Sequence, residues 1–502
     1  MKTRILLWSL VFPLALSFWL SGTAPTAHAA YTFTKVADTD TPIPGGIGNF
    51  AFFQGNGPAL DQGVVVFIGF DSDRQTGVYQ WVDGALSVVA DTNTIVPGKS
   101  ETFGGFGPWP SVDNGVIGVP GGVRISGVGR DVLATSSGGL LNVVAVGRET
   151  AVPGTGQVPP PTFAVLGSAN LGDGDVAFFG RFSLGSSLAE GIYSTIGGTI
   201  SVVADAQTQT PDGSGDFFFP LGFASTDPSI DGGAVAFNGR GPAGPSQQHG
   251  IYLWEWGILR VVADNNTLIP GNSEKFSSAI RASLNGGRIA FVGGGPSGQR
   301  GIYLDDGLSL GVVVDNNTEV PGHPGLFFTS FGGPALDDDA LAFLGFFGAG
   351  DRGIFLVRNA MINTVVEVGD MLDGKEISSL SFLDDDALGG EEIAFRTTFL
   401  DGSQGIFIAA PTSDPADLIA QLIQSVEDLN LQRGIENSLK AKLNVAQKVL
   451  GDANPNNDSA AVNTLSAFID ELEAQRGKKI PVDAADALIA DAQAIIDLLM
   501  GG

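Results

Sequence analysis

The sequence of 502 residues contains no cysteine, which excludes disulfide bonds, thiol nucleophiles, cysteine-ligated metals and a lipidated amino-terminal cysteine. Histidine is nearly as rare. Only His249 and His323 lie beyond the first 30 residues, so three-histidine zinc sites and H-E-x-x-H motifs are excluded too. Basic residues are also scarce, with 26 lysines and arginines against 54 acidic residues, for a formal net charge of −28. Because nucleic acids bind through clusters of basic side chains, we expect no nucleic-acid partner.

Long apolar runs are confined to the amino terminus. Residues 1–30 combine the basic residues Lys2 and Arg4, an apolar stretch, and the small residues Ala27 and Ala29 at a cleavage site, as in a Sec signal peptide. No later stretch reaches the ~18 uninterrupted apolar residues that a spanning helix needs, so we predict no transmembrane segment in the mature chain. We expect an exported protein, either secreted into the extracellular space or held at the cell surface.

One string recurs through most of the chain. "RVVADNNTLIPG" at 260–271 joins a β-branched strand, a turn of the Asx type and Pro-Gly, and related strings occur at six other places. A fixed period of about 55 residues predicts a solenoid, a propeller or an array. The fourth residues of the "VVAD" strings lie 51 to 59 residues apart and are Asp38, Asp91, Val146, Asp205, Asp264, Asp315 and Val368.

The content of each repeat favours the propeller. Residues 276–315 contain four strand-like strings, and "NGG" supplies the tight turn between the first two. Seven such sets occupy residues 31–409, although the unit at 98–146 is degenerate. The lone strand at 31–38 is left to pair with the last hairpin, near Ile408, and this pairing closes a ring without an open edge. We therefore predict a mainly β fold, a seven-bladed β-propeller of four-stranded blades.

The composition changes abruptly after residue 409. Residues 410–415, "APTSDP", have the character of a linker, and residues 416–502 carry apolar side chains in a helical period. The first stripe is Leu418, Leu422, Val426 and Leu429, and the third is Val462, Leu465, Phe468, Ile469 and Leu472. We predict a small all-α bundle of four helices, because each stripe has to be buried against another.

Both halves resemble known families. The strings "SLNGGRIAF" and "NLGDGDVAF" are similar to the bacterial tandem-repeat proteins that are named for an N-x-x-G-x-x-A-F motif. Residues 415–500 resemble the FIMAH domain of secreted bacterial proteins, through "NSLKAKLNVAQKVL", "NTLSAFIDELEAQRGKKI" and "ADALIADAQAII". Neither resemblance brings catalytic residues with it. The second implies an accessory or anchoring role, which would be noncovalent because lipidation and a long apolar tail are both missing.

Carboxylates are the abundant candidates for chemistry. The triple-aspartate runs at 337–339 and 384–386 both align with the first hairpin turn of their blades, and we interpret them as solvated turns. The Asp-Asn-Asn strings lack the D-x-D-x-D-G frame of a calcium loop, so turns are favoured over calcium. "GLSLG" at 307–311 lies in a turn and an outer strand, not at a nucleophile elbow. We predict no catalytic residue, no metal ligand and no cofactor, with calcium as the alternative.

One position is polar in six repeats and takes five different residue types there, while its surroundings stay the same. It is the residue just before the glycine that begins the third strand of a repeat, as in the "GIY" strings. The loop that carries it lies on the same face of the propeller as the crossings, the "DNNTLIPG"-type segments that lead from one blade to the next. If a ligand binds, we expect it on this face; the alternative is ordinary variation at the ends of loops. The candidates are Thr76, Glu190, His249, Arg300, Arg352 and Gln404.

These observations predict a secreted or cell-surface propeller that binds a glycan or a protein without catalysing a reaction. Two alternatives stay open. One is a propeller hydrolase or lyase that acts on polysaccharide through loop carboxylates, and the other is a purely structural repeat protein. Carboxylates that converge with a basic or aromatic group, at the axis or in a loop-lined cleft, would favour the enzyme.

Overall fold

The computed structural model describes residues 31–501, apart from 56, 74, 186, 212–214, 218–227, 242–247, 359, 413–414, 430 and 451–457. The expected signal peptide, residues 1–30, lies outside the described residues. The chain divides into two compact units, of which one runs to Gln421 and contains every strand, and the other begins at Leu422. Each unit is described by itself.

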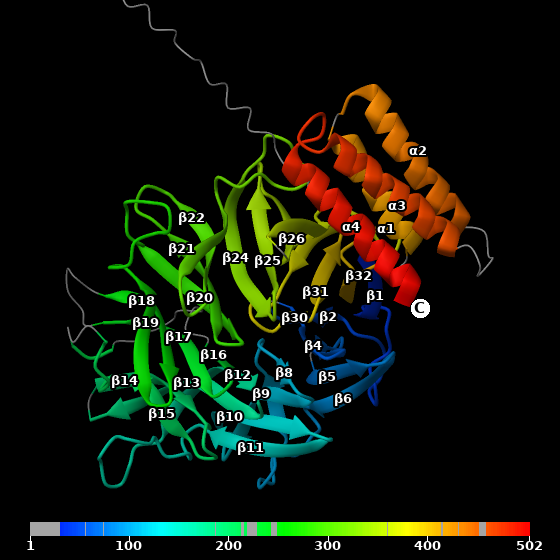
Figure 1. Ribbon diagram of the computed structural model, residues 1–502. Coiled ribbons are helices and arrows are strands. Elements are labelled where there is room, and N and C mark those ends of the chain that lie inside the picture. The colour runs from blue at the N-terminus through cyan, green and yellow to red at the C-terminus, as the bar shows by residue number, and fades with distance from the viewer. Residues whose placement is uncertain are drawn as a thin grey trace, which may run out of the picture. The chain divides into compact units, whose positions relative to one another are not determined.

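Seven sheets make up the first unit, and we number them as blades 1 to 7 in chain order (Figure 1). Blade 1 contains β2 (Phe52–Phe53), β3 (Ala59–Asp61), β4 (Val64–Phe70), β5 (Thr76–Val82) and β6 (Ala85–Asp91). Blade 2 contains β7 (Phe103–Phe106), β8 (Ser111–Asp113), β9 (Val116–Ile125), β10 (Val128–Ser137) and β11 (Leu140–Val146). Blade 3 contains β12 (Phe163–Gly172), β13 (Asp175–Leu184), β14 (Ser187–Ser194) and β15 (Ser201–Asp205). The degenerate unit at 98–146 is thus a complete blade, as its length predicts.

Blades 4 to 6 follow the same order of four antiparallel strands. Blade 4 contains β16 (Ser229–Asp231), β17 (Ala234–Arg240), β18 (His249–Glu255) and β19 (Ile258–Asp264). Blade 5 contains β20 (Ser278–Asn285), β21 (Arg288–Gly294), β22 (Arg300–Asp305) and β23 (Leu310–Asp315). Blade 6 contains β24 (Phe328–Asp337), β25 (Ala340–Phe347), β26 (Asp351–Arg358) and β27 (Met361–Glu367). Blade 7 contains β28 (Met371–Leu372), β29 (Lys375–Ser381), β30 (Leu388–Gly389), β31 (Glu392–Phe399) and β32 (Gln404–Pro411), together with β1 (Tyr31–Asp38).

The innermost strands form a closed circle. Strands β3, β8, β12, β16, β20, β24 and β30 each contact the next in that order, and β30 contacts β3 again. Strand β1 pairs antiparallel with β32, from Tyr31 opposite Pro411 to Asp38 opposite Gly405. The predicted seven-bladed propeller and its closure by residues 31–38 are therefore confirmed.

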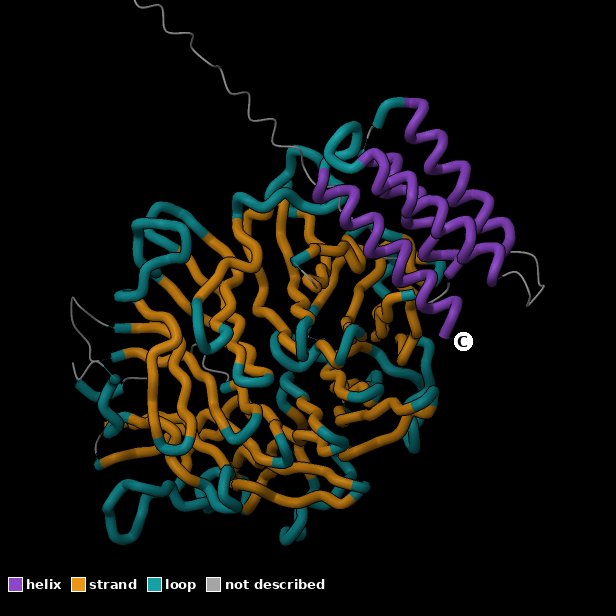
Figure 2. Tube along the Cα trace, in the orientation of Figure 1, coloured by secondary structure: helices purple, strands orange, loops and turns teal. Residues whose placement is uncertain are grey.

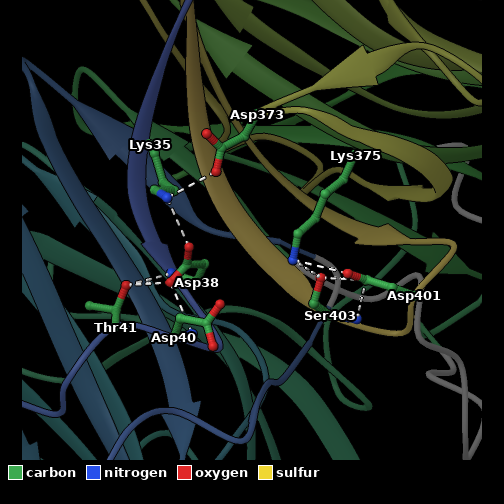
Figure 3. Close-up of polar contacts among 8 residues, drawn as sticks. All are labelled: Lys35, Asp38, Asp40, Thr41, Asp373, Lys375, Asp401 and Ser403. Carbon is green, nitrogen blue, oxygen red and sulfur yellow. Dashed lines mark hydrogen bonds and ion pairs between the residues drawn. The ribbon is translucent and has the colours of Figure 1, made fainter.

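Charged side chains gather on the closing blade (Figure 3). Lys35 Nζ lies 2.9 Å from carboxylate oxygens of both Asp38 and Asp373, and Lys375 Nζ lies 3.0 Å from Asp401 Oδ2. Such partly exposed ion pairs are worth about 0–1 kcal/mol each. Closure therefore rests on the strand pairing and on the burial of Val36 and Ala37, which are 6% and 1% exposed.

A recurring aromatic group explains why the second strand of most blades has a glycine two residues after its Ala-Phe pair, as in Ala290-Phe291-Val292-Gly293. In blades 1, 3, 4, 5 and 6, a phenylalanine that follows the crossing packs edge-on against the aromatic residue of the third strand, with ring centroids 4.8–5.0 Å apart. In blade 5 these rings are Phe276 and Tyr303, and a Cβ atom at Gly293 would lie 2.5 Å from Phe276. The glycine is required because the ring occupies the space of its side chain.

Replacing Gly293 with alanine should destabilise blade 5 by about 1–3 kcal/mol, because the added methyl group overpacks Phe276 and Tyr303. Gly311, on β23 of the same blade, has no atom within 4 Å of its ideal Cβ position and serves as the matched control. Thermal unfolding should show a lower midpoint for Gly293→Ala and an unchanged or slightly higher one for Gly311→Ala. Equal midpoints for the two variants would contradict this packing.

The recurring "VVADNNT"-type strings, which lead from one blade to the next, form the predicted Asx-type turns. Asp91 Oδ1 accepts hydrogen bonds from Thr94 Oγ1 at 2.7 Å and from the Asn93 amide at 3.0 Å. The same two bonds occur at Asp38, Asp205, Asp264 and Asp315. In the last repeat, Glu367 pairs with Gly353 as Asp91 pairs with Gly77, so Glu367 and not Val368 stands at the aspartate position.

The carboxyl-terminal region contains the four predicted helices, which are purple in Figure 2: α1 (Pro415–Asp428), α2 (Arg433–Leu450), α3 (Asp458–Gln475) and α4 (Val482–Gly501). Helix α3 packs against both α2 and α4. The apolar stripes are buried largely as the period predicts, with Leu465, Phe468 and Leu472 fully inside. One difference is that Ala461 is buried on α3 whereas Val462 is only partly so.

Candidate functional site

A belt of hydrogen bonds surrounds one end of the propeller axis. In blades 1 to 6 the turn after the inner strand carries an Asp or Asn, and in five of these blades its side-chain oxygen accepts a hydrogen bond from the backbone amide of the next blade's turn. The pairs are Asp61 with Asn114, Asp173 with Gly232, Asp231 with Gly286, Asn285 with Asp338, and Asp337 with Gly390. The Asn or Asp of "SLNGG" and "SIDGG" thus joins neighbouring blades.

The two triple-aspartate runs do not occupy the same place, contrary to the prediction. Residues 337–339 form the β24–β25 turn as expected, and Arg288 pairs with Asp339 there. Residues 384–386 instead lie before β30, where they interrupt the inner strand of blade 7. The equivalent stretch of blade 6, Gly332 and Gly333, is a bulge in β24. Because a bulge leaves side chains outside the ladder, the run in blade 7 can turn towards the axis.

Asp385 of blade 7 hydrogen-bonds to four other blades, blades 3 to 6. Asn170 Nδ2 and the hydroxyl groups of Ser229 and Ser283 donate hydrogen bonds to its carboxylate, and its amide donates to Pro334 O at 3.0 Å. The three donor side chains come from equivalent inner-strand positions of blades 3, 4 and 5 and are at most 9% exposed. Each serine hydroxyl also accepts the amide of the next blade, at 2.8 Å and 2.9 Å. The carboxylate is therefore fully engaged inside the protein.

The electrostatics of the pair at 384–385 follow from burial. Desolvation raises the pKa of Asp385 well above its usual range, although the three donors oppose the shift. Desolvation also raises the pKa of Asp384, and the Arg281 guanidinium, which is paired with this carboxylate, partly offsets that effect. Two carboxylates and an arginine do converge at the axis, which the sequence left undecided.

The axial space beneath Asp385 is small. A cavity of about 110 Å³ is lined by Asp61, Asp113, Asp231, Asp337 and Asp385. Small-molecule sites usually enclose roughly 300–1,000 Å³, whereas this volume suits a few water molecules. A glycosidase also needs two carboxyl groups that face each other across the scissile bond. Four of these carboxylates, those of Asp61, Asp231, Asp337 and Asp385, instead hydrogen-bond to other blades, and the cavity has no room for a sugar between them.

The six predicted ligand-face residues are placed one to a blade and do not form a cluster. Thr76 and Glu190 are buried, and Glu190 Oε1 lies 2.6 Å from Arg181 Nε. Gln404 Oε1 accepts the Phe53 amide at 2.9 Å, and His249 Nε2 lies 2.7 Å from Ser277 O, so both bridge to the next blade. Arg300 on β22 is exposed and Arg352 on β26 is partly exposed.

A seventh member of this set, Asp131 of blade 2, is not apparent from the sequence pattern. In blade 2, the Gly147 amide donates to Asp131 O at 2.8 Å, as Asn316 does to Arg300 O at 2.9 Å in blade 5. Asp131 Oδ2 also accepts the Leu166 amide of the next blade at 3.0 Å. The glycine that begins the other third strands is replaced by valine in "RDVLA", so the glycine does not mark this position in the sequence. Asp131 nevertheless lies 55 residues after Thr76, as the period predicts.

Within the part of the chain that the structure describes, no three histidine, aspartate or glutamate side chains are grouped as ligands of one metal ion. The crossing aspartates are already engaged by their own turns. We therefore expect EDTA to shift the melting temperature of the protein by less than a few degrees. A large decrease that calcium alone reverses would make a metal part of the fold.

Comparisons with solved structures find proteins of low similarity. One is a puromycin-hydrolysing peptidase of Mycobacterium tuberculosis, with 14% identity, a TM-score of 0.40, and coverage of 75% of this chain and 53% of that one. Another is a Pyrococcus horikoshii acylaminoacyl peptidase, with 12% identity, a TM-score of 0.42, and coverage of 70% and 52%. The polysaccharide lyase Uly1 shares 10% identity at a TM-score of 0.37, with 77% and 99% covered. This chain spans about half the length of the two peptidases. At these identities and TM-scores, the similarities carry no argument about this chain.

Sequence comparisons bear on both parts of the chain. No curated protein matches. Among the described residues, no helix is long and apolar enough to cross a membrane. Residues 415–497 match the FIMAH domain, so that resemblance is confirmed, whereas the relation of the blades to N-x-x-G-x-x-A-F proteins stays a prediction. Residues 46–388 match the model of DUF7453, and the chain therefore belongs to this family of unknown function.

Proposed function

We propose that this protein is an exported binding module, in which the propeller holds an extracellular or cell-surface ligand and does not transform it. The observation that supports this most is the use made of the axial carboxylates. Asp385 accepts three side-chain hydrogen bonds, Asp384 is paired with Arg281, and five turn residues bond to the next blade. General acid–base chemistry needs groups that reach the substrate, and these face protein atoms.

The rival function is hydrolysis or cleavage of a polysaccharide, since carboxylates and an arginine do meet at the axis. Purified full chain should be tested in parallel on glycan and protein arrays and against a panel of hydrolase and lyase substrates. We expect retention of a ligand without turnover. Turnover that Asp384→Asn or Asp385→Asn abolishes, in variants that still fold, would replace the binding function with the enzymatic one.

The helical region is proposed to attach the propeller to a surface. Strand β32 ends at Pro411 and α1 begins at Pro415, so a truncation after residue 411 removes no strand. We expect residues 31–411 to fold alone with an all-β circular dichroism spectrum, and residues 414–502 to fold as a marginally stable helical bundle.

Deleting residues 414–502 should release the propeller from cells into the medium and leave its ligand preference unchanged. Fractionation of cells that express the full and the truncated chain measures this directly. Equal amounts of the two chains in the culture supernatant would argue against an anchoring role for the helices.

A further inference from the structure

A cavity of about 490 Å³ lies on blade 2, between β9, β10 and the Gly104–Gly107 stretch on one side and β12 of blade 3 on the other. We call it the blade-2 pocket. Its volume falls in the usual range of small-molecule sites, roughly 300–1,000 Å³. Seven glycines line it, Gly122 among them, together with Trp109, Arg124, Asp131, Leu133 and Leu166.

At the blade-2 pocket one side chain is missing from a pair that recurs in every blade. Each residue at the variable position before the third strand lies opposite a residue of the second strand. From blade 1 to blade 7 these opposing residues are Phe70, Gly122, Arg181, Arg240, Gly294, Phe346 and Thr398. In blade 3 the pair is Arg181 with Glu190, and the two side chains form an ion pair. In blade 2 the carboxylate of Asp131 has only Gly122 opposite it.

Of the charged residues that line the pocket, Arg130 is paired with Glu149, whereas Asp131 and Arg124 keep hydrogen-bonding capacity for a ligand. Asp131 Oδ2 accepts the Leu166 amide, which fixes the carboxylate, while Oδ1 accepts no hydrogen bond from the described residues. Paired residues and every second residue along a strand point to the same face, so Gly122, Arg124 and Asp131 share the pocket side of the blade. Arg124 is exposed, and its Nη1 donates to Gly127 O at 3.5 Å, which engages only one of the five guanidinium donors. The ligand therefore meets a fixed acceptor and a guanidinium donor together.

This donor set selects the ligand class. A cationic ligand would be attracted by Asp131 but repelled by Arg124. An anionic ligand would be repelled by Asp131 and by the net charge of −28 of the chain. Vicinal hydroxyl groups donate to a carboxylate and accept from a guanidinium at the same time. The walls formed by Trp109, Leu133 and Leu166 suit the C–H face of a pyranose ring. Resting on the binding function proposed above, we infer that the blade-2 pocket holds an uncharged hexose residue of a glycan.

The test fills the pocket with the side chain that blade 3 already uses. At Gly122 a Cβ atom would have only Arg130 O within 4 Å, at 3.6 Å, and the backbone is not left-handed, so Gly122→Arg should fold and pair with Asp131. Gly311→Arg is the matched control, since nothing lies within 4 Å of that Cβ position on blade 5. Thermal melts of both variants check the fold. Asp131→Asn keeps an acceptor for Leu166 and removes the charge.

Calorimetric titration of the full chain uses maltotriose, cellotriose and a uronate trisaccharide as probes. We expect at least one neutral trisaccharide to bind, Gly122→Arg and Asp131→Asn each to weaken it about tenfold or more, and Gly311→Arg to match the parent. Binding that survives Gly122→Arg would overturn the pocket while leaving the binding function intact. Preference for the uronate, or no binding of either neutral sugar, would overturn the ligand class. Cleavage of a probe would overturn the binding function instead.

Discussion

Replacing Asp385 with alanine should lower the melting temperature of the propeller by roughly 5–10 °C. The substitution leaves Asn170, Ser229 and Ser283 without their common acceptor inside the ring. Removing one member of such a buried network costs about 3–5 kcal/mol, and in a domain of this size each kcal/mol corresponds to about 2 °C. Asp339 on the β24–β25 turn has an 85% exposed side chain, so Asp339→Ala is the control and should change the midpoint by no more than about 1–2 °C.

The same residue sets a pH dependence. Burial raises the pKa of Asp385 in the folded chain above its value in the unfolded chain, so folding favours the protonated carboxyl group. Its stabilising contribution is complete below the unfolded pKa and is lost as the pH rises through the folded pKa. Between about pH 5 and pH 8, the parent should therefore lose more stability than Asp385→Asn, which cannot ionise. Urea unfolding at both pH values measures the free energy of unfolding of each protein. An equal change in this free energy for the parent and for Asp385→Asn would contradict the burial of a titrating group.

Deleting residues 31–38 should have the largest effect of all, a loss of more than about 10 °C in melting temperature or an insoluble product. The deletion removes β1, leaves the hydrogen-bonding edge of β32 open, and takes Val36 and Ala37 out of the core. An open edge next to exposed apolar surface promotes association between chains. Thermal melts and size-exclusion chromatography of the deleted and parent chains provide the measurement.

Two controls separate strand closure from the charges beside it. Lys35→Ala and Lys375→Ala each remove ion pairs of the closing blade and leave β1 in place (Figure 3), so each should cost no more than about 1 kcal/mol. If the lysine variants melted as low as the deletion, the charged cluster would be closing the ring. If the deletion melted like the parent, β1 would not be needed for closure.

Several features follow from sequence alone because each is a local pattern repeated many times. The period of about 55 residues, the four strands per repeat and the unpaired string at 31–38 are enough to predict seven blades and their closure, which the structure confirms. The Asx-type turns and the FIMAH match are recognised in the same way, from short strings whose hydrogen bonds or family pattern are local. Repetition helps, because seven copies average out the irregularity of any one.

Only the tertiary structure decided what the individual side chains do. The run at 384–386 resembles 337–339 in sequence, yet it interrupts an inner strand and reaches blades 3 to 6, because the corresponding stretch of other blades is a bulge. Three of the seven variable residues before the third strand, Gln404, His249 and Asp131, hydrogen-bond to the next blade, and the period alone did not reveal these bonds. The blade-2 pocket depends on a glycine opposite a carboxylate. Pairing across strands joins residues that no period connects, and for this reason the sequence determined the ring of blades while the fold determined its hub and its pocket.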